Sequence, residues 1–444
     1  MIDKSIWLDF LPLFSMICSY MQHILLSLLA FFARLIIARH HPYIIGVTGT
    51  VGKTTITTHI ARFLTQELGN HHVGYSLHHY NGEYGLPLTI IGCRTPGRNP
   101  FLWIWVFVLA LSRLIRPYPQ YLVLEYGIDH PWEMQFLLDI ATPDIAIITP
   151  VEPNHLEQFG SLELYRANKL MLIEHAKHRI IHESLRQYID LDALYYSLGA
   201  LSDIDAAHIE MDISGTRAVV QYNKKQYPIS LPAIGTFQIE NLLPLYAIAD
   251  ILHIDPAHIA RYASHGSPES GRSSILTGIH DSMIIDGSYN GGYLSLREGI
   301  VSMRSFLHSH RIIFLIGDMR ELGEVSRDVH EQLAREICDI IPHESRVSFY
   351  LVGPMMRDYV APILSSHFHT FSSLSSRDMG ERIAQDLAKN KTDTIIYAKW
   401  SQNTIFIEEG IKSLLSDLLD VGRLPRQTVS WMAKKETFFR SLEK

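Results

Sequence analysis

The stretch Gly46 to Thr55, GVTGTVGKTT, has residue types and spacing suited to binding the phosphates of a nucleotide. Successive backbone N–H groups in a glycine-rich turn form an anion cradle, and a helix that follows points the positive end of its dipole at the same spot. In such a loop Lys53 reaches the β- and γ-phosphates and Thr54 offers its hydroxyl to Mg²⁺. We therefore predict a site for a nucleoside triphosphate and Mg²⁺. The predicted phosphate-binding residues are Gly49, Thr50, Gly52, Lys53, Thr54 and Thr55.

The segments around this loop have the patterns of the strand and the helix that must position it. An apolar run precedes the loop at 43–47, and apolar residues recur at helical spacing after it, at 56, 60, 63, 64 and 68. Two further short apolar runs, 121–125 and 144–149, end in polar residues, as buried parallel strands do. Ligands gather at the carboxyl ends of such strands. Glu125 and the segment after Thr149 should therefore lie beside the phosphates.

Length and composition set the broad class. A chain of 444 residues is long for one hydrophobic core, so two or three domains are expected. The net charge of −7 and the 19% of charged residues predict no nucleic-acid surface. The three cysteines are scattered, at 18, 93 and 338, so they form neither a disulfide framework nor a C-x-x-C metal site. A reducing compartment, the cytoplasm, fits this composition, and we expect a monomer.

The order of the predicted elements indicates an α/β fold. We predict a central parallel-sheet ATP-binding domain of the phosphate-loop type at 43–268 and a C-terminal Rossmann-like α/β domain at 269–444, preceded by an apolar helical segment at 1–42. A segment rich in Ser, Gly and Pro, 264–272, marks the boundary. Strand-like runs alternate with helical stretches beyond it, at 282–286, 312–316, 348–352 and 394–398.

Two apolar segments could contact a membrane. Residues 10–33 include no charged side chain and would form a helix about 36 Å long, enough to cross a hydrocarbon core of about 30 Å. Arg34 and Arg39 follow this segment, which predicts that the rest of the chain lies in the cytoplasm. The second run, 101–112, is too short to span and suits an interfacial or a buried helix. Two interpretations stay open: attachment to the inner face of the cytoplasmic membrane, or burial within the protein.

The phosphate loop deviates from the strict pattern G-x-x-x-x-G-K-[ST] because Val47 stands at its first glycine. The variant T-G-T-x-G-K-T-T resembles the loop of the Mur ligase family, the ATP-dependent amide-bond-forming enzymes of peptidoglycan precursor synthesis. The resemblance extends from about Tyr43 to about Gly410 and is closest to the subgroup that joins D-alanyl-D-alanine to UDP-N-acetylmuramoyl tripeptide. It implies ATP and Mg²⁺ as cofactors, and a muramyl-peptide acceptor and D-alanyl-D-alanine as partners.

Four segments of the predicted central domain carry this resemblance. LEYG at 124–127 is similar to the family's E-x-G and implies that Glu125 binds Mg²⁺. ITPVEPNHLEQFGS at 148–161 implies that His155 lies beside a second metal, and YRANKLMLIEHAK at 165–177 implies that Lys169 takes up CO₂ as a carbamate. The turn-rich segment at 80–89, YNGEYGLPLT, implies that Asn81 contacts substrate. A capping glutamate, a structural histidine, an unmodified surface lysine and an ordinary turn are the alternatives.

The C-terminal part resembles the family with several departures. Arg272 fits an arginine that approaches the γ-phosphate, and an arginine fork suits such oxygens. IIDGSYNGGYLSL at 284–296 places Asp286 and Asn290 near ribose or adenine, although Gly287 replaces the family's second aspartate. The segment IGDMRELGEVSRDVH at 316–330 is the most subgroup-specific match.

Two further matches each contain a substitution. In GTFQIEN, 235–241, Asn241 keeps the place of an adenine contact, whereas Phe237 and Gln238 replace a His-Asn pair. AKWSQNTIFIEEG, 398–410, is similar to a K-G-S motif and implies that Lys399 and Ser401 face substrate, although a tryptophan replaces the glycine.

The predicted reaction transfers the γ-phosphoryl group of ATP to a carboxylate, after which an amine attacks the acyl phosphate. Lys53, His155, Lys169 and Arg272 form the predicted catalytic set, and Thr54, Glu125, His155 and Lys169 form the predicted metal site. Only 45 residues precede the loop, so we expect no N-terminal UDP-binding domain, and a lipid-linked muropeptide is an alternative acceptor.

Other activities stay open on the same fold. A muropeptide-amidating ligase would need a four-cysteine zinc ribbon, which three cysteines cannot build, and folylpolyglutamate synthase usually has G-K-G-S in the loop. A non-catalytic, membrane-tethered ATP-binding homologue is the alternative from another class.

Overall fold

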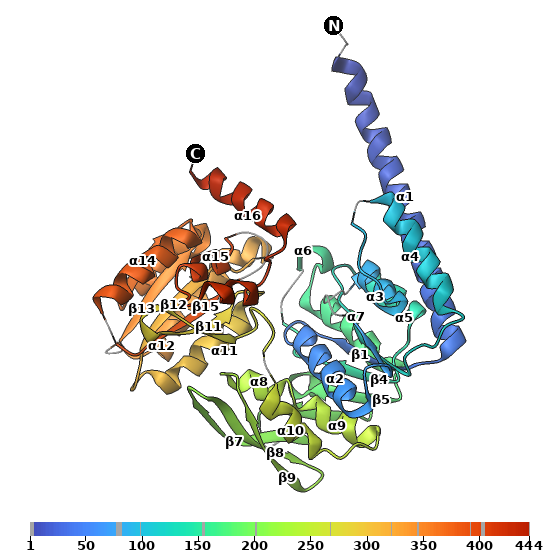
Figure 1. The fold of residues 1–444 in the computed structure, drawn as a ribbon, viewed down its shortest axis with the longest axis horizontal. Helices are drawn as coiled ribbons and strands as arrows, with labels where there is room; N and C mark the ends of the chain where they lie inside the picture. Colours follow the sequence, from blue (N-terminus) through green and yellow to red (C-terminus); the bar gives the residue numbers. More distant parts are fainter. Residues whose placement is uncertain are drawn as a thin grey trace. The chain divides into compact units, whose positions relative to one another are not determined.

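A computed structural model describes the backbone of residues 4–443 apart from 77–81, 98, 153–155, 200–201, 267, 321, 344–345, 391 and 401–404. Side chains are described from residue 22 onward, apart from those same residues and from 100 and 156–157. The chain forms two compact units. The first contains Met1–Tyr196 and Pro244–Ile254, and the second contains Ser197–Leu243 and Asp255–Lys444. Both units are mixed α/β, as predicted (Figure 1). The domain limits expected near residues 42 and 268 stay a prediction.

The first unit is built on a parallel sheet with strand order β2-β3-β1-β4-β5-β6. The strands are β1 (Tyr43–Thr48), β2 (Val73–Tyr75), β3 (Tyr121–Glu125), β4 (Ile145–Ile148), β5 (His178–His182) and β6 (Leu194–Ser197). The helices are α1 (Lys4–His40), α2 (Lys53–Leu68), α3 (Gly82–Ile91), α4 (Pro100–Arg113), α5 (Glu133–Ile140), α6 (Leu156–Phe159), α7 (Leu162–Glu174), the 3₁₀ helix η1 (Glu183–Tyr188) and α9 (Pro244–Ile251). Because β1 lies between β3 and β4, the ends of all three strands meet at the phosphate loop.

The second unit contains an antiparallel set of strands and a six-stranded sheet. Strands β7 (Ile204–Asp212), β8 (Gly215–Tyr222) and β9 (Lys225–Leu231) are antiparallel. The sheet has the order β10-β11-β15-β12-β13-β14, and only its edge strand β10 is antiparallel. These strands are β10 (Ser274–Thr277), β11 (Met283–Gly287), β12 (Arg311–Gly317), β13 (Val347–Val352), β14 (His369–Ser373) and β15 (Thr394–Lys399).

Helices cover both faces of this six-stranded sheet. The helices of the unit are α8 (Thr236–Glu240), α10 (His258–His265), α11 (Tyr293–Met303), α12 (Ser326–Ile340), α13 (Ala361–Leu364), α14 (Ser376–Lys389), α15 (Ile407–Lys412) and α16 (Val429–Leu442), with short turns η2 (Ile279–Asp281), η3 (Arg304–Phe306), η4 (Gly323–Val325), η5 (Met356–Val360) and η6 (Leu418–Arg423). Alternate residues of β12 belong to two cores: Phe314 packs with α11 and α12, and Leu315 packs with α14 and α15. This alternation follows from the two-residue period of a strand, and it gives a sheet with helices on both faces.

The segment 80–89, which the sequence predicts to be turn-rich, is helical from Gly82 onward. Pro87 lies inside α3, where a proline costs a helix about 3 kcal/mol. Leu86, Leu88 and Ile90 are each about 1% exposed, and burying one such side chain contributes roughly 1.5–3 kcal/mol. Burial in the core therefore outweighs the local preference of the sequence for a turn.

A close contact between α14 and α15 yields a test of the fold. A Cβ atom at Gly380 would lie 2.2 Å from the carbonyl oxygen of Gly410, so Gly380→Ala must push the two helices apart. We expect this substitution to lower the free energy of unfolding by about 1–3 kcal/mol, measured by urea denaturation followed by circular dichroism. Gly422→Ala is the matched control, because nothing lies within 4 Å of its Cβ position. Equal stability of the two variants would contradict the packing described.

Candidate active site

The phosphate loop connects β1 to α2 and depends on two glycines with positive φ. Gly49 has φ +136°, and a Cβ atom there would lie 1.9 Å from Thr149 Oγ1, so no side chain fits. Gly52 has φ +88° at the start of α2. The Thr50 backbone N–H donates to the Pro150 carbonyl at 2.9 Å, which ties the loop to the end of β4. The loop therefore has the strand–turn–helix context that the sequence predicts.

The hydroxyl and the carboxylate predicted to bind Mg²⁺ lie in contact. Thr54 Oγ1 donates to Glu125 Oε1 at 3.2 Å, because Val47 and Glu125 are paired in register at the ends of β1 and β3. Glu125 is only 5% exposed. Lys53 Nζ donates to the Thr50 carbonyl at 3.1 Å and so lies over the loop. A hydroxyl and a carboxylate are the hard oxygen ligands that Mg²⁺ prefers, so this pair fits the ion.

Lys169 lies on the buried face of α7 and is 1% exposed. Its Nζ lies 4.5 Å from the centre of the Tyr165 ring, in cation–π geometry. Burial lowers the pKa of Lys169 well below its ordinary value, the charge of Lys53 lowers it further, and Glu125 is one of the carboxylates that oppose the shift. The Lys169 side chain is thus within electrostatic reach of the loop lysine and of the predicted magnesium ligand. A lowered pKa favours the neutral amine, which is the nucleophilic form of lysine.

Three predicted site residues, Asn81, His155 and Ser401, lie outside the described residues. Of the four predicted metal-binding residues, the structure therefore describes Thr54, Glu125 and Lys169. Among the described side chains, no three His, Cys, Asp or Glu groups lie close enough together to hold a metal ion. Of the predicted set, Thr54 and Glu125 are in contact, and Lys169 is coupled to Glu125 through its charge.

In the second unit, two groups contact the Arg272 side chain and a third contacts its backbone carbonyl. Its Nε lies 3.3 Å from Glu269 Oε2, and its guanidinium carbon lies 4.6 Å from the centre of the Tyr289 ring. Gln238 Nε2 donates to the Arg272 carbonyl at 3.3 Å. The glutamine that departs from the family motif therefore supports the predicted phosphate-binding arginine. Asn241 ends helix α8 and is partly exposed.

Asp286 and Lys399 lie at the ends of the neighbouring strands β11 and β15. Burial raises the pKa of Asp286 to about 6, against hydrogen bonds from Ser288. Burial and the charge of Arg272 lower the pKa of Lys399 to about 8. A Cβ atom at Gly287 would lie 2.9 Å from Lys399 Cδ, so the glycine that replaces the family's second aspartate makes room for the lysine chain.

Trp400 and Arg426 hold the backbone of the loop that follows β11. Trp400 Nε1 donates to the Ser288 carbonyl at 2.5 Å, and Arg426 donates to the same carbonyl at 3.1 Å and to the Tyr289 carbonyl at 2.6 Å. The Trp400 side chain is buried, and the Arg426 guanidinium carbon lies 5.1 Å from its ring centre. Asn290 follows in the same loop and is exposed, with its Oδ1 accepting the Gly291 N–H at 2.8 Å.

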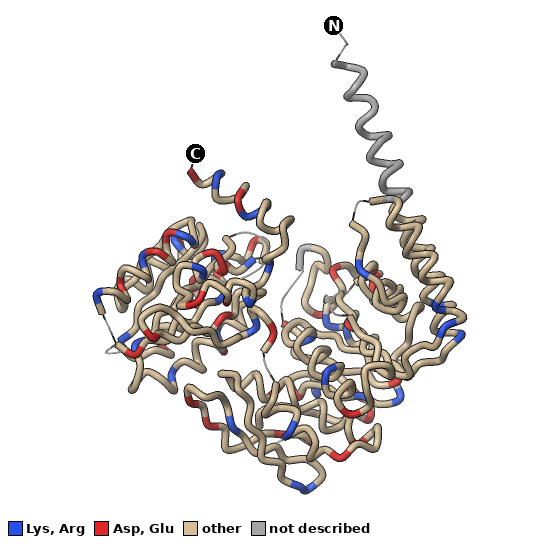
Figure 2. Tube along the Cα trace, in the orientation of Figure 1, with Lys and Arg blue, Asp and Glu red and all other residues tan. Residues whose placement is uncertain are grey.

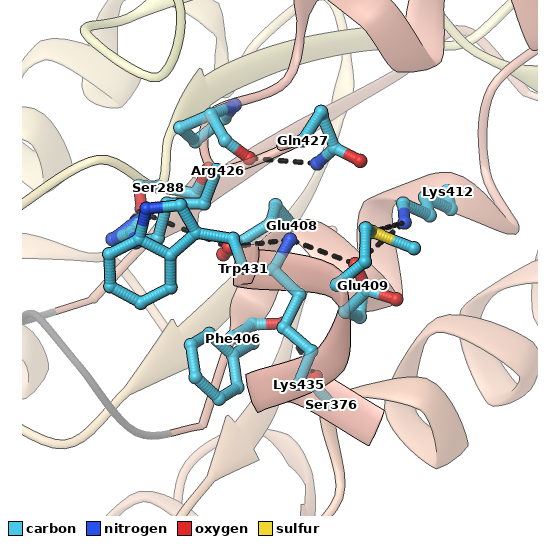
Figure 3. Close-up of polar contacts among 12 residues, drawn as sticks. Ser288, Ser376, Phe406, Glu408, Glu409, Lys412, Arg426, Gln427, Trp431 and Lys435 are labelled. Carbon is cyan, nitrogen blue, oxygen red and sulfur yellow. Dashed lines mark hydrogen bonds and ion pairs between the residues drawn. The ribbon is translucent and has the colours of Figure 1, made fainter. Parts of the chain in front are cut away.

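A buried ion-pair cluster fixes helix α16 beside this loop (Figure 3). Lys435 is 0% exposed and its Nζ lies 3.0 Å from Glu408 Oε1 and 2.9 Å from Glu409 Oε1. Arg426 approaches Glu408 at 3.6 Å, and Lys412 approaches Glu409 at 2.7 Å. Neither Arg426 nor Lys435 was predicted from the sequence. Adjacent glutamates after β15 and adjacent lysines in α16 were the only signal.

The subgroup-specific segment 316–330 has a structural centre in His330. Its Nδ1–H donates to the Ser326 carbonyl at 2.6 Å, and its Nε2 accepts the Met319 N–H at 3.0 Å, so both ring nitrogens are used. Burial lowers the pKa of His330, which keeps the ring neutral as this pairing needs. The histidine therefore locks the loop after β12 onto α12.

Comparison with known proteins is consistent with this site. Residues 47–249 match the Mur ligase middle domain. The chain is 25% identical over 309 residues to the UDP-N-acetylmuramoyl-tripeptide--D-alanyl-D-alanine ligase of Haemophilus influenzae, covering 67% of this chain and 62% of the relative. It is 22% identical over 385 residues to the Bacillus subtilis ligase of the same name, covering 85% and 76%. The chain thus spans less than two thirds of the Haemophilus relative.

Solved structures show the same fold. MurF from Acinetobacter baumannii matches with a TM-score of 0.69 and 18% identity, covering 88% of this chain and 80% of that protein. MurF ligase from Thermotoga maritima, solved in complex with ADP, matches with a TM-score of 0.69 and 20% identity, covering 90% and 83%. At these identities the likeness concerns the fold.

The lowered pKa of Lys169 predicts a pH-dependent stability difference. A lysine whose pKa is lower in the folded chain lowers the free energy of unfolding at pH values below its unfolded pKa of about 10.4. This loss of stability disappears above that pH. In CO₂-free buffer, Lys169→Met should therefore melt at a higher temperature than wild type near neutral pH, and the gap should narrow as pH rises. Scanning calorimetry between neutral pH and pH 9 measures this. A lower melting temperature for Lys169→Met at neutral pH would refute it.

The ion-pair cluster predicts a large effect at Lys435. Replacing it by methionine leaves Glu408 and Glu409 short of a buried counter-charge, which costs about 3–5 kcal/mol of unfolding free energy. Urea denaturation measures the loss, and Glu408→Gln in the same chain should recover part of it. Lys434→Met, at the exposed neighbouring position, should change stability by less than about 1 kcal/mol. Similar free energies of unfolding for the Lys435 and Lys434 variants would show that the ion-pair cluster does not stabilise the fold.

Proposed function

We propose that this chain, which carries a Mur ligase middle domain in residues 47–249, is an ATP-dependent ligase that forms an amide bond through an acyl phosphate. The proposed reaction joins D-alanyl-D-alanine to a muramyl tripeptide in peptidoglycan precursor synthesis, the reaction in the names of its relatives. The carrying observation is the contact between Thr54 and Glu125 beside the phosphate loop, with Lys169 buried within electrostatic reach. Because the proposed reaction consumes ATP, which the cytoplasm supplies, the proposal includes a cytoplasmic location.

The phosphate loop positions the nucleotide in this proposal. Its backbone N–H groups and the start of α2 bind the phosphates, and Lys53 swings from the Thr50 carbonyl to the β- and γ-phosphates. Thr54 and Glu125 would hold Mg²⁺, and His155 would lie beside a second metal ion. The ion, when bound, neutralises charge on the phosphate oxygens. Phosphoryl transfer needs little covalent work from side chains, so positioning and charge neutralisation dominate.

Lys169 is the proposed site of the carbamate. The lone pair of the neutral amine forms an N–C bond to the carbon of CO₂ while one C=O π pair moves onto oxygen. The nitrogen then loses a proton to solvent, and the side chain becomes a carbamate anion. Burial favours the neutral amine that this step needs. The carbamate anion attracts Mg²⁺, which a protonated lysine would repel.

Polar groups of the second unit have the proposed roles of nucleotide and substrate contacts. Arg272 would bind the γ-phosphate, Asp286 and Asn290 the ribose or the adenine, and Asn241 the adenine. Lys399, with its pKa near 8, and Ser401 would face the substrate. The departures from the family motifs are filled by new contacts, such as Gln238 to the Arg272 carbonyl, which supports an active enzyme over a degenerate one.

Product formation by the full chain tests the proposal. ATP, Mg²⁺ and D-alanyl-D-alanine are supplied with either the UDP-linked or the lipid-linked muramyl tripeptide, and phosphate release and product mass are measured. Lys53→Ala should lower turnover by on the order of 10²-fold or more, because it removes one charge-stabilising donor. Lys177→Ala, an exposed lysine of the same unit, is the control and should keep full turnover. No amide product with either acceptor, despite normal ATP binding, would overturn the proposal, as would full turnover by Lys53→Ala.

A further inference from the structure

Helices α1 and α4 present a continuous set of exposed apolar side chains that the proposed reaction does not use. In α4, Phe101 is 79%, Trp105 69% and Ile104 62% exposed, although all three are large and apolar. In α1 the exposed residues recur at positions 24, 28, 31 and 35, which is one face of a helix. We call this surface the α1–α4 face, and its residues are Ile24, Leu28, Phe31, Leu35, Phe101, Leu102, Ile104, Trp105, Val108 and Leu111. Ten exposed apolar side chains gathered on two helices mark a binding surface.

The two helices lie side by side and run in the same direction. The Phe32 and Phe107 rings are 5.6 Å apart, and the His40 ring lies 2.8 Å from the Arg113 carbonyl, so the carboxyl-terminal ends of both helices are adjacent. Asn99 caps α4 by accepting the N–H groups of Phe101 and Leu102, which fixes where the apolar helix begins. The exposed side chains of the two helices therefore belong to one surface.

The opposite side of α1 is part of the protein core. By length and composition, Gln22–His40 could cross a membrane. Leu29, Ala33 and Ile36 are each 0% exposed, however, and they pack in the same core as Ile44 of β1. A bilayer-spanning position for this stretch would remove those side chains from the core. The described part of α1 is therefore suited to lie against a membrane surface, with one side on the domain and one side on lipid.

In α4 and in the part of α1 whose side chains are described, the charged residues lie toward the carboxyl-terminal ends. The described part of α1 has no Lys, Arg, Asp or Glu before Arg34, and α4 has none before Arg113, so the blue segments of both helices in Figure 2 lie toward their carboxyl-terminal ends. The arginines are Arg34 and Arg39 in α1, Arg113 at the end of α4, and Arg116 three residues beyond it. Of these, Arg34, Arg39 and Arg116 are exposed, and Arg34 Nε donates to the Asp139 carbonyl at 3.0 Å. An apolar face with a tryptophan and a cationic rim complements anionic headgroups above an acyl layer.

We propose that the α1–α4 face docks the first unit onto an anionic lipid surface, with Trp105 and its apolar neighbours in the acyl region and Arg39 and Arg116 at the headgroup phosphates. This contact is monotopic in the described part of α1. It is independent of the proposed ligase reaction, because none of these side chains touches the phosphate loop. Docking would hold the site near a membrane-bound substrate or partner.

Vesicle flotation with the full chain tests this contact. The protein is mixed with vesicles of phosphatidylcholine alone or with added phosphatidylglycerol, and the bound fraction is measured at low and high salt. Wild type should float with the anionic vesicles, and binding should weaken with salt. Trp105→Glu should reduce the partition coefficient by on the order of tenfold, because it puts a charge in the apolar layer. Arg39→Gln and Arg116→Gln should each reduce it by roughly fivefold, and only with anionic vesicles.

A matched control and a depth probe separate this face from other sources of binding. Leu419→Glu adds the same charge at an 85% exposed leucine in the second unit and should bind as wild type does. Brominated lipid should quench tryptophan fluorescence of wild type more than that of Trp105→Phe. Unchanged flotation of Trp105→Glu would overturn the proposal. The proposal would also fail if wild type bound no vesicles but self-associated, and if Trp105→Glu abolished that self-association. That result would indicate a second copy of the chain as the occupant. Melting temperatures near that of wild type confirm that the variants are folded.

Discussion

The phosphate loop closes against the end of β4 with no space for a side chain at Gly49. A Cβ atom there would overlap Thr149, and the backbone of Thr50 bonds to Pro150 one residue further on. This approach sets the path of the chain into α2, and it places Lys53 and Thr54 at the start of the helix. Because β1 lies between β3 and β4, the same geometry brings Glu125 to the Thr54 hydroxyl. The positions of Lys53, Thr54 and Glu125 in the candidate site therefore depend on this contact.

The second unit shows how departures from a motif can be mutually consistent. Gly287, in place of an aspartate, leaves the space that Lys399 fills. Trp400, in place of a glycine, donates to the Ser288 carbonyl, and Arg426 donates to the same oxygen. Read one at a time, these substitutions suggest a degenerate site. Read as contacts, they hold the loop after β11 with three donors on one carbonyl and a ring beside a guanidinium.

Buried charge is concentrated at functional and structural centres of the protein for different reasons. Lys169 and Lys399 are buried with lowered pKa values, which costs stability and favours neutral amines at the site. Lys435 is equally buried, but two glutamates pair with it and it fixes α16. A buried pair of this kind is weak as a source of net stability, yet removing one partner is costly. The contrast lies in the partners: carboxylates touch Lys435, whereas an aromatic ring faces Lys169.

The sequence by itself determined the phosphate loop, the strands beside it, the α/β class and the candidate residues of the first unit. These features depend on short-range patterns, namely glycines at fixed spacing, apolar runs ending in polar residues, and helical periodicity. Only the tertiary structure decided that 82–91 is a helix despite Pro87, that Gln238 supports Arg272, and that Arg426 and Lys435 converge on the loop after β11 and on Glu408. It also decided that one side of α1 is core and the other is exposed. These outcomes depend on contacts between residues far apart in the chain, where burial outweighs local preference, and no local pattern encodes which partner fills a given space.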